Sequence, residues 1–269
     1  MSRLPVPTTE SGRAALASLL TEPADALVAL DFDGTLAPIV DRPELAVSHP
    51  DAPAALGALC AKVATVAIIT GRPAADAVRL GGFADIAGLV VLGHYGLERW
   101  SAGRLETPAE DPGVSAARAA GARLVAQAPA GVVLEDKGHS VAFHTRRAAD
   151  PAAVLAEIRP LVDALARDSG LELAPGRFVL ELRPPGTDKG TSLRRLVADT
   201  AAWTVVFVGD DLGDLAAVAA LRSLDVAGLV VCSDSPESPP ALRREADLVV
   251  DGPDGVVAFL AAVADQIST

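Results

Sequence analysis

The feature that most constrains this chain is a set of short segments that are apolar at almost every position. Six such segments, rich in Val, Leu and Ile, lie at residues 26–30, 63–69, 88–92, 203–208, 228–232 and 247–250. A strand with one face in water alternates apolar and polar residues, whereas a parallel strand covered on both faces is apolar throughout. The six segments therefore predict a parallel β-sheet buried between two layers.

Helices are expected between and around these segments. Their patterns place them at residues 11–20, 52–61, 73–80, 190–200, 214–222 and 254–265. A regular alternation of strand and helix is typical of doubly wound sheets, in which ligands bind beyond the carboxyl ends of the strands. We therefore predict an α/β fold whose core is a Rossmann-like doubly wound parallel sheet.

The middle of the chain, residues 104–184, follows a different pattern. Two helix-like stretches, 113–127 and 151–167, each precede a pair of strand-like segments. This order, αββαββ, predicts an α+β cap domain inserted into the core. The expected domains are thus the catalytic core, residues 1–103 and 185–269, and the cap, residues 104–184.

The strand-like segments of the cap alternate, as strands with one covered face do. In the last of them Phe178, Leu180 and Leu182 share one face, and Glu181 and Arg183 share the other. An earlier strand separates in the same way, with Val141, Phe143 and Thr145 opposite Ser140, His144 and Arg146. The polar face either meets water or forms a lid over the core's site, and we favour the lid.

Composition excludes several kinds of partner. No apolar stretch reaches the ~18 uncharged residues that a membrane span needs, and the first residues resemble no secretory leader. Cys60 and Cys232 lack the spacing of metal ligands. A net charge of −12 argues against nucleic acid. We therefore expect a cytoplasmic, monomeric protein that binds a small molecule.

Two groups of acidic residues stand where apolar segments end. Asp31 and Asp33, two residues apart on an extended segment, point to the same side. Although Asp-Gly is also a common turn, two like charges on one side repel unless a cation or a proton lies between them. Asp210, Asp211 and Asp214 follow the fourth apolar segment. Because Mg²⁺ prefers oxygen ligands, the two groups together predict a magnesium site.

Four motifs occur in order along the core: DFDGT, TGR, DKG and GDDLGD, at residues 31–35, 70–72, 188–190 and 209–214. In this order on an α/β sheet they resemble the motifs of the phosphatases of the haloacid dehalogenase superfamily. The resemblance implies phosphoryl transfer through an aspartyl phosphate with Mg²⁺ as the cofactor.

The resemblance also implies a role for each acidic residue. Asp31 would be the nucleophile, and Asp33 the general acid and then the general base. The ligands of Mg²⁺ would be Asp31, the backbone carbonyl of Asp33, and Asp210. Asp211 and Asp214 would support these ligands.

The other motif residues are expected to handle the phosphate. Thr70 ends a strand just before a helix, so its hydroxyl and nearby backbone N–H groups would cradle the phosphate. Lys189 would neutralise the phosphoryl oxygens and Asp31. Further contacts to the substrate are expected from Gly34, Thr35, Gly71 and Arg72.

The cap narrows the family. The segments LEDKGHSVAFHTR and LELRPPGTDKG resemble those of trehalose-6-phosphate phosphatases, whose cap carries Glu-x-Lys, then His-x-Arg, then a Glu before the motif lysine. The resemblance implies a sugar phosphate as substrate and sugar contacts from Glu135, Lys137 and Glu181, supported by His144 and Arg146. Arg183 would help to hold the phosphate or to close the lid. Charged groups suit a polyhydroxyl ligand because each hydroxyl both donates and accepts.

Two departures from the family pattern leave alternatives open. Tyr95, in GHYGLE, stands where the family usually has histidine, and the last motif continues as LGDLAAV instead of with Thr-Asp-Glu. The chain could therefore hydrolyse another sugar phosphate, such as sucrose phosphate or a mannosyl phosphoglycerate, or be a catalytically weak sensor of sugar phosphates. Both Asp31 and Asp33 are present, which favours an enzyme.

Overall fold

The computed structural model describes residues 4–40, 42–176, 178–236 and 238–267. The chain divides into two compact units, which we call the core unit (Met1–Glu106 with Asp188–Thr269) and the cap unit (Thr107–Thr187). Within the described residues, no helix has both the length and the apolar character needed to cross a membrane.

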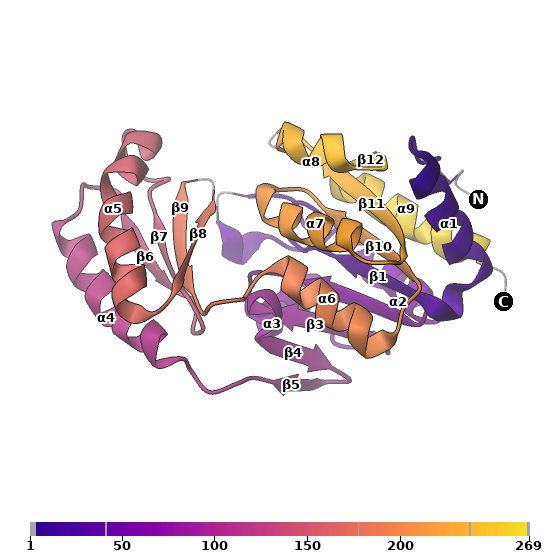
Figure 1. Cartoon of the computed structure of the whole chain (residues 1–269), viewed down its shortest axis with the longest axis horizontal. Coiled ribbons are helices and arrows are strands. Elements are labelled where there is room, and N and C mark those ends of the chain that lie inside the picture. The colour runs from indigo at the N-terminus through magenta and orange to yellow at the C-terminus, as the bar shows by residue number, and fades with distance from the viewer. Residues whose placement is uncertain (1–3, 41, 177, 237, 268–269) are drawn as a thin grey trace. The chain divides into compact units, whose positions relative to one another are not determined.

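The core unit is built on one sheet of eight strands, in the order β12-β11-β10-β1-β2-β3-β4-β5 (Figure 1). The six predicted strands are present and parallel: β1 (Ala26–Leu30), β2 (Thr65–Ile69), β3 (Leu89–Gly93), β10 (Thr204–Gly209), β11 (Ala227–Asp234) and β12 (Leu248–Asp251). The strand order runs outward in both directions from the neighbours β1 and β10. This pair is the topological switch point, where ligands of doubly wound sheets bind.

Helices cover both faces of the sheet, which explains why β1 is buried at every position. Val28 and Leu30 of β1 pack into one hydrophobic core, and Leu27 and Ala29 pack into the other. The first core includes residues of α1 (Glu10–Thr21), α2 (Ala52–Cys60), α3 (Ala74–Gly81) and α9 (Gly252–Gln266). The second includes residues of α6 (Lys189–Thr200), α7 (Leu215–Ser223) and α8 (Pro240–Glu245). Short 3-10 turns complete the unit: η1 (Pro23–Asp25), η2 (Pro43–Leu45), η3 (His94–Gly96) and η4 (Leu212–Asp214).

The core sheet extends further than the sequence pattern indicated. Strands β4 (Glu98–Ser101) and β5 (Arg104–Glu106) add an antiparallel hairpin to the edge at β3. The turn between them places Ala102 and Gly103 at positive φ, and Trp100 packs into the core. The cap unit therefore begins at Thr107 instead of residue 104, and it extends to Thr187 instead of residue 184.

The cap unit has the predicted αββαββ order, so the predicted fold class is confirmed. Its elements are α4 (Pro112–Gln127), β6 (Val133–Asp136), β7 (Val141–His144), α5 (Pro151–Ser169), β8 (Glu172–Gly176) and β9 (Val179–Arg183). The strands form an antiparallel sheet in the order β6-β7-β9-β8. Phe143, Leu180 and Leu182 are buried in one cluster with residues of α4 and α5, which is the apolar face that the alternation predicts.

One residue of that predicted face lies elsewhere. Phe178 precedes β9 and has a φ of +59°, a backbone conformation outside the extended range of a strand. The alternation therefore holds from Val179 to Arg183 but not at Phe178. On the polar face, the register aligns Glu135 of β6 with Ala142 of β7, and Ala142 with Glu181 of β9.

Candidate active site

The site begins with Asp31, the residue that directly follows β1. Its backbone N–H continues the pairing with β10 by donating to the carbonyl of Val208 at 2.9 Å. Its side chain is buried, and Lys189 Nζ, from the first residue of α6, lies 2.7 Å from Oδ1. These two residues lie 158 positions apart in the sequence (189 − 31), and they form a buried ion pair at the switch point.

Asp214 holds the loop that follows β10. Its Oδ1 lies 2.6 Å from Lys189 Nζ, and its Oδ2 accepts hydrogen bonds from the backbone N–H groups of Asp210 and Asp211 at 2.9 and 3.0 Å. A side chain at Gly209 would place its Cβ 2.5 Å from Asp214 Cγ, so this position requires glycine. Asp214 thus bonds both the Lys189 ammonium and the backbone of the loop after β10.

Asp210 has a different environment from Asp214. Its Oδ1 is buried and has no hydrogen-bond partner among the described residues. Its other oxygen lies against Gly34, where a Cβ would come within 2.0 Å of it and where φ is +73°. Gly34 is therefore needed both for its backbone conformation and for the close approach of Asp210.

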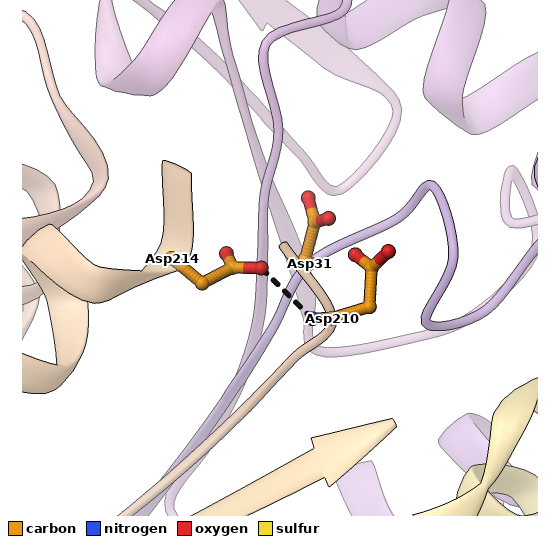
Figure 2. Close-up of side chains that lie close together, drawn as sticks. All are labelled: Asp31, Asp210 and Asp214. Atoms are coloured by element: carbon orange, nitrogen blue, oxygen red, sulfur yellow. Dashed lines mark hydrogen bonds between the residues drawn. The ribbon is translucent and has the colours of Figure 1, made fainter. Parts of the chain in front are cut away.

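Figure 2 shows Asp31, Asp210 and Asp214 gathered at one point, with the hydrogen bond from the Asp210 backbone to Asp214. One oxygen from each of the three lies within 4.8 Å of the others. Carboxylate oxygens, one of them buried and bonded by no described residue, suit a divalent cation that prefers oxygen ligands.

The electrostatics of the site also favour a cation. Burial raises the pKa of Asp31 to about 8, although the Lys189 ammonium opposes this rise. Burial, together with the charges of Asp31 and Asp214, raises the pKa of Asp210 to about 10. Burial lowers the pKa of Lys189, but Asp214 and Asp31 outweigh it and keep that pKa well above its usual value. The single ammonium does not balance the buried carboxyl groups when all of them are ionised, so a divalent ion would stabilise their charged forms.

Asp33 does not join this group through its side chain. Its two carboxylate oxygens accept hydrogen bonds from Arg72, at 2.6 Å from Nε and 2.5 Å from the terminal nitrogen Nη2. The charge and hydrogen bonding of Asp33 outweigh the effect of burial and raise the pKa of Arg72. Arg72 was expected to contact the phosphate, and in this structure its guanidinium faces Asp33.

The turn that carries Thr70 and Gly71 is closely packed. Thr70 is buried, and its Oγ1 accepts a hydrogen bond from the backbone N–H of Arg72 at 3.2 Å. A Cβ on Gly71 would lie 2.6 Å from the hydroxyl oxygen of Tyr95, so Tyr95 packs against this turn. Thr35 is also fully buried, and its hydroxyl has no hydrogen-bond partner in the described part of the chain.

Two positioning residues of the core were not found from the sequence. Glu98 of β4 accepts a hydrogen bond from the backbone N–H of Ala74 at 2.6 Å, so it occupies the start of α3 that was expected to cradle phosphate. Ser233, at the end of β11, donates to the carbonyl of Gly34 at 2.6 Å. Ser233 lies near the carboxyl end of β11, a location that could have drawn attention to it. Glu98 is the first residue of β4 and pairs with Gly93 at the carboxyl end of β3.

The polar face of the cap sheet carries its own cluster. Glu181 is buried; its Oε1 accepts a hydrogen bond from Ser140 at 2.5 Å, and its Oε2 lies 3.4 Å from Lys137 Nζ. Lys137 Nζ is also 3.9 Å from Glu135, whose Oε2 lies 2.8 Å from His144 Nε2. The structure thus brings together four of the five residues predicted to bind the sugar or to support its binding, and Ser140 is an additional member.

The two arginines of the cap that were expected to act on the substrate are placed differently. Arg183 is the last residue of β9 and is half-buried. Arg146 lies in the turn after β7 and is exposed. These positions leave the roles of both arginines as predictions.

Comparison with known proteins identifies the family. The family model for trehalose-phosphatase matches residues 29–247. The trehalose-phosphate phosphatase of Mycolicibacterium paratuberculosis is 33% identical over 255 residues, which cover 89% of this chain and 62% of that protein. The corresponding protein of Mycobacterium marinum is 34% identical over 266 residues, which cover 93% of this chain and 64% of that protein. The chain therefore spans less than two thirds of the length of these relatives.

A solved structure supports the fold. The C-terminal domain of the C. albicans trehalose-6-phosphate phosphatase superposes with a TM-score of 0.75 at 20% identity, covering 98% of this chain and 99% of that domain. The match of the family model over most of the chain, together with the mycobacterial relatives, shows that the chain belongs to the trehalose-phosphatase family.

Proposed function

We propose that this protein is a cytoplasmic, magnesium-dependent phosphatase that hydrolyses trehalose 6-phosphate to trehalose and phosphate through an aspartyl phosphate on Asp31. The observation that carries the proposal is the buried contact of 2.7 Å between Asp31 and Lys189, beside the unbonded oxygen of Asp210. The family match and the printed names of the mycobacterial relatives support the choice of substrate.

The proposed reaction has two steps, both at phosphorus. First, an Asp31 oxygen bonds to phosphorus while the bond from phosphorus to the sugar oxygen breaks and leaves its electron pair on that oxygen. Asp33 gives this oxygen a proton. Second, water attacks the same phosphorus, Asp33 takes a proton from the water, and the bond to Asp31 breaks. Lys189 offsets negative charge on Asp31 and on the phosphoryl group.

The proposed ligands of Mg²⁺ are the side chains of Asp31 and Asp210 and the backbone carbonyl of Asp33. Asp214 and Asp211 would support them, since Asp214 bonds Lys189 and the N–H groups of the loop that carries Asp210. When bound, Mg²⁺ supplies positive charge that stabilises the phosphoryl oxygens. Thr70, Gly71, Gly34 and Thr35 are proposed to line the place of the phosphate.

We further propose that the polar cluster of the cap binds the sugar. Glu135 and Glu181 supply acceptors, and Lys137 supplies three donors between them. His144 bonds Glu135, while Arg146 and Arg183 add positive charge. A ligand with many hydroxyls matches this mixture because each hydroxyl can donate to a carboxylate and accept from the ammonium.

The first experiment is phosphate release from trehalose 6-phosphate, sucrose 6-phosphate and glucose 6-phosphate, with Mg²⁺ and with excess chelator. We expect trehalose 6-phosphate to be the preferred substrate and the chelator to abolish turnover. Asp31→Asn should lower kcat by at least about 10³-fold, because the amide is nearly isosteric but a far poorer nucleophile. Asp85→Asn, at an exposed position, is the matched control and should retain wild-type kinetics.

Each part of the proposal has its own contrary result. Preference for another sugar phosphate would exclude the substrate, and full activity in chelator would exclude the metal. Near-normal turnover by Asp31→Asn would exclude the aspartyl phosphate. A wild-type protein that binds these esters but releases no phosphate would be a sensor.

The metal site can be tested without activity. Since the pKa of Asp210 is raised from 3.8 to about 10, the folded state disfavours its charged form, and the apoprotein loses stability as the pH rises through this range. Asp210→Asn cannot ionise, so its melting temperature without metal should exceed that of the wild type, by a margin that grows from pH 4 towards neutral pH. Mg²⁺ at 100 times its dissociation constant should stabilise the wild type by about 2.7 kcal/mol and the variant much less. Equal stabilisation of both proteins by Mg²⁺ would contradict the assignment of Asp210.

The cap cluster predicts a selective loss. Glu181→Ala should lower kcat/KM for trehalose 6-phosphate by about ten- to a hundred-fold, since a hydrogen bond to a charged group contributes roughly 1.5–3 kcal/mol. Its effect on p-nitrophenyl phosphate, which has no sugar, should be much smaller. Glu157→Ala, an exposed position on α5, is the control. Equal losses on the two esters would show that Glu181 supports the fold and does not read the sugar.

A further inference from the structure

Arg72 uses its guanidinium group within the protein. Nε and Nη2 donate to the two oxygens of Asp33, and Nη1 donates to the backbone carbonyl of Pro43 at 2.8 Å. All three nitrogens therefore have a protein partner. Nη1 and Nη2 each keep one further N–H, but these bonds direct the guanidinium at Asp33 and at the Pro43 carbonyl, where the TGR motif led us to expect a phosphate.

The remaining contacts of Arg72 fix its position. The guanidinium carbon lies 5.5 Å from the centre of the Phe32 ring. Phe32 is fully buried, and in the sequence it stands between Asp31 and Asp33. The Phe32 ring in turn meets the ring of Phe83 edge-on at 6.1 Å. The backbone of Arg72 donates to Thr70 Oγ1 and accepts from the backbone N–H of His94 at 2.9 Å.

The two partners differ in exposure. The side chain of Arg72 is 15% exposed, whereas that of Asp33 is 39% exposed. Arg72 is thus the more buried member, and Asp33 is the member that a ligand can reach. Each carboxylate oxygen has two lone pairs, so Asp33 retains hydrogen-bonding capacity beyond the bonds to Arg72.

We propose that Arg72 is a positioning residue that orients the Asp33 carboxyl group for proton transfer to the leaving oxygen. This inference rests on the proposed phosphatase function. The two parallel bonds fix the plane of the carboxyl group as well as its location, which a single bond cannot do. Arg72 acts on the reaction only through Asp33, and it is neither a phosphate ligand nor a general acid itself.

The leaving group distinguishes this role from others. The alkoxide of a sugar is strongly basic and therefore a poor leaving group, so its departure depends on a proton from Asp33. The p-nitrophenolate anion is stable without a proton. The parameter kcat/KM covers only the steps up to departure of the leaving group, so the later hydrolysis of the phosphoenzyme does not affect it.

The test measures kcat/KM of the full chain with Mg²⁺ for trehalose 6-phosphate and p-nitrophenyl phosphate. Arg72→Ala should lower kcat/KM for the sugar phosphate by about 10²-fold, which lies within the range of general acid catalysis. The factor by which it lowers kcat/KM for the aryl ester should be smaller by at least about ten-fold. Inhibition by inorganic phosphate should keep its wild-type strength. Arg72→Lys should behave like Arg72→Ala, because an ammonium keeps the charge but cannot form two parallel bonds.

A double-mutant cycle tests whether Arg72 acts through Asp33. In the Asp33→Asn background, Arg72→Ala should cost little more on the sugar phosphate, because the group that it orients is already absent. Arg79→Ala is the matched control: it removes an exposed arginine of α3 that pairs with Asp76, and it should leave both substrates unaffected.

Several results would overturn the inference. Additive losses in the cycle, equal losses on the two esters, weaker inhibition by phosphate, or rescue by Arg72→Lys would each contradict positioning through Asp33. If the wild type releases phosphate from neither ester, the proposed function itself fails and this inference fails with it. If the wild type is active but the losses in the double-mutant cycle are additive, the phosphatase function stands and only the proposed role of Arg72 is excluded.

Discussion

The arrangement of this site depends on the buried contact of Lys189 with Asp31 and Asp214. Burying an ion pair costs desolvation energy that is recovered only if the geometry is good and the remaining oxygens are bonded. Asp214 meets that condition through its bonds to two loop N–H groups, but Asp210 has a buried oxygen that no described residue bonds. When its carboxyl groups are ionised, the site carries more negative charge than Lys189 balances, and this excess is the ground for the cation proposed above.

The surrounding residues allow these charges to lie so close together. Gly34 leaves room for Asp210, and Gly209 leaves room for Asp214, because a Cβ at either glycine would collide with the aspartate. Ser233 ties the carbonyl of Gly34 to β11. Asp33, although only two residues from Asp31, is bonded to a separate cation, Arg72. The two acidic residues of the first motif thus have different partners, which suits the different roles proposed for a nucleophile and a general acid.

Much of this could be predicted from the sequence because the signals were local or periodic. Apolar segments located the six parallel strands, and alternation from Val179 to Arg183 located the faces of the cap sheet. The pairing of Lys189 with Asp31 was expected only from the resemblance to a known family. The two bonds from Arg72 to Asp33 were not predicted, because sequence spacing does not fix the direction of a long side chain. The β4–β5 hairpin was too short to show periodicity, and the alternation gave no sign that Phe178 has a positive φ just before β9.

The most direct test of the account is to trap the covalent intermediate. Protein mixed with trehalose 6-phosphate and Mg²⁺ is quenched in acid during turnover, and its peptides are analysed by mass spectrometry. We predict one additional phosphoryl group on Asp31 in the peptide that contains it, and none in Asp31→Asn. Phosphate release during turnover with no phosphorylated Asp31, or with the phosphoryl group on another residue, would contradict the central claim.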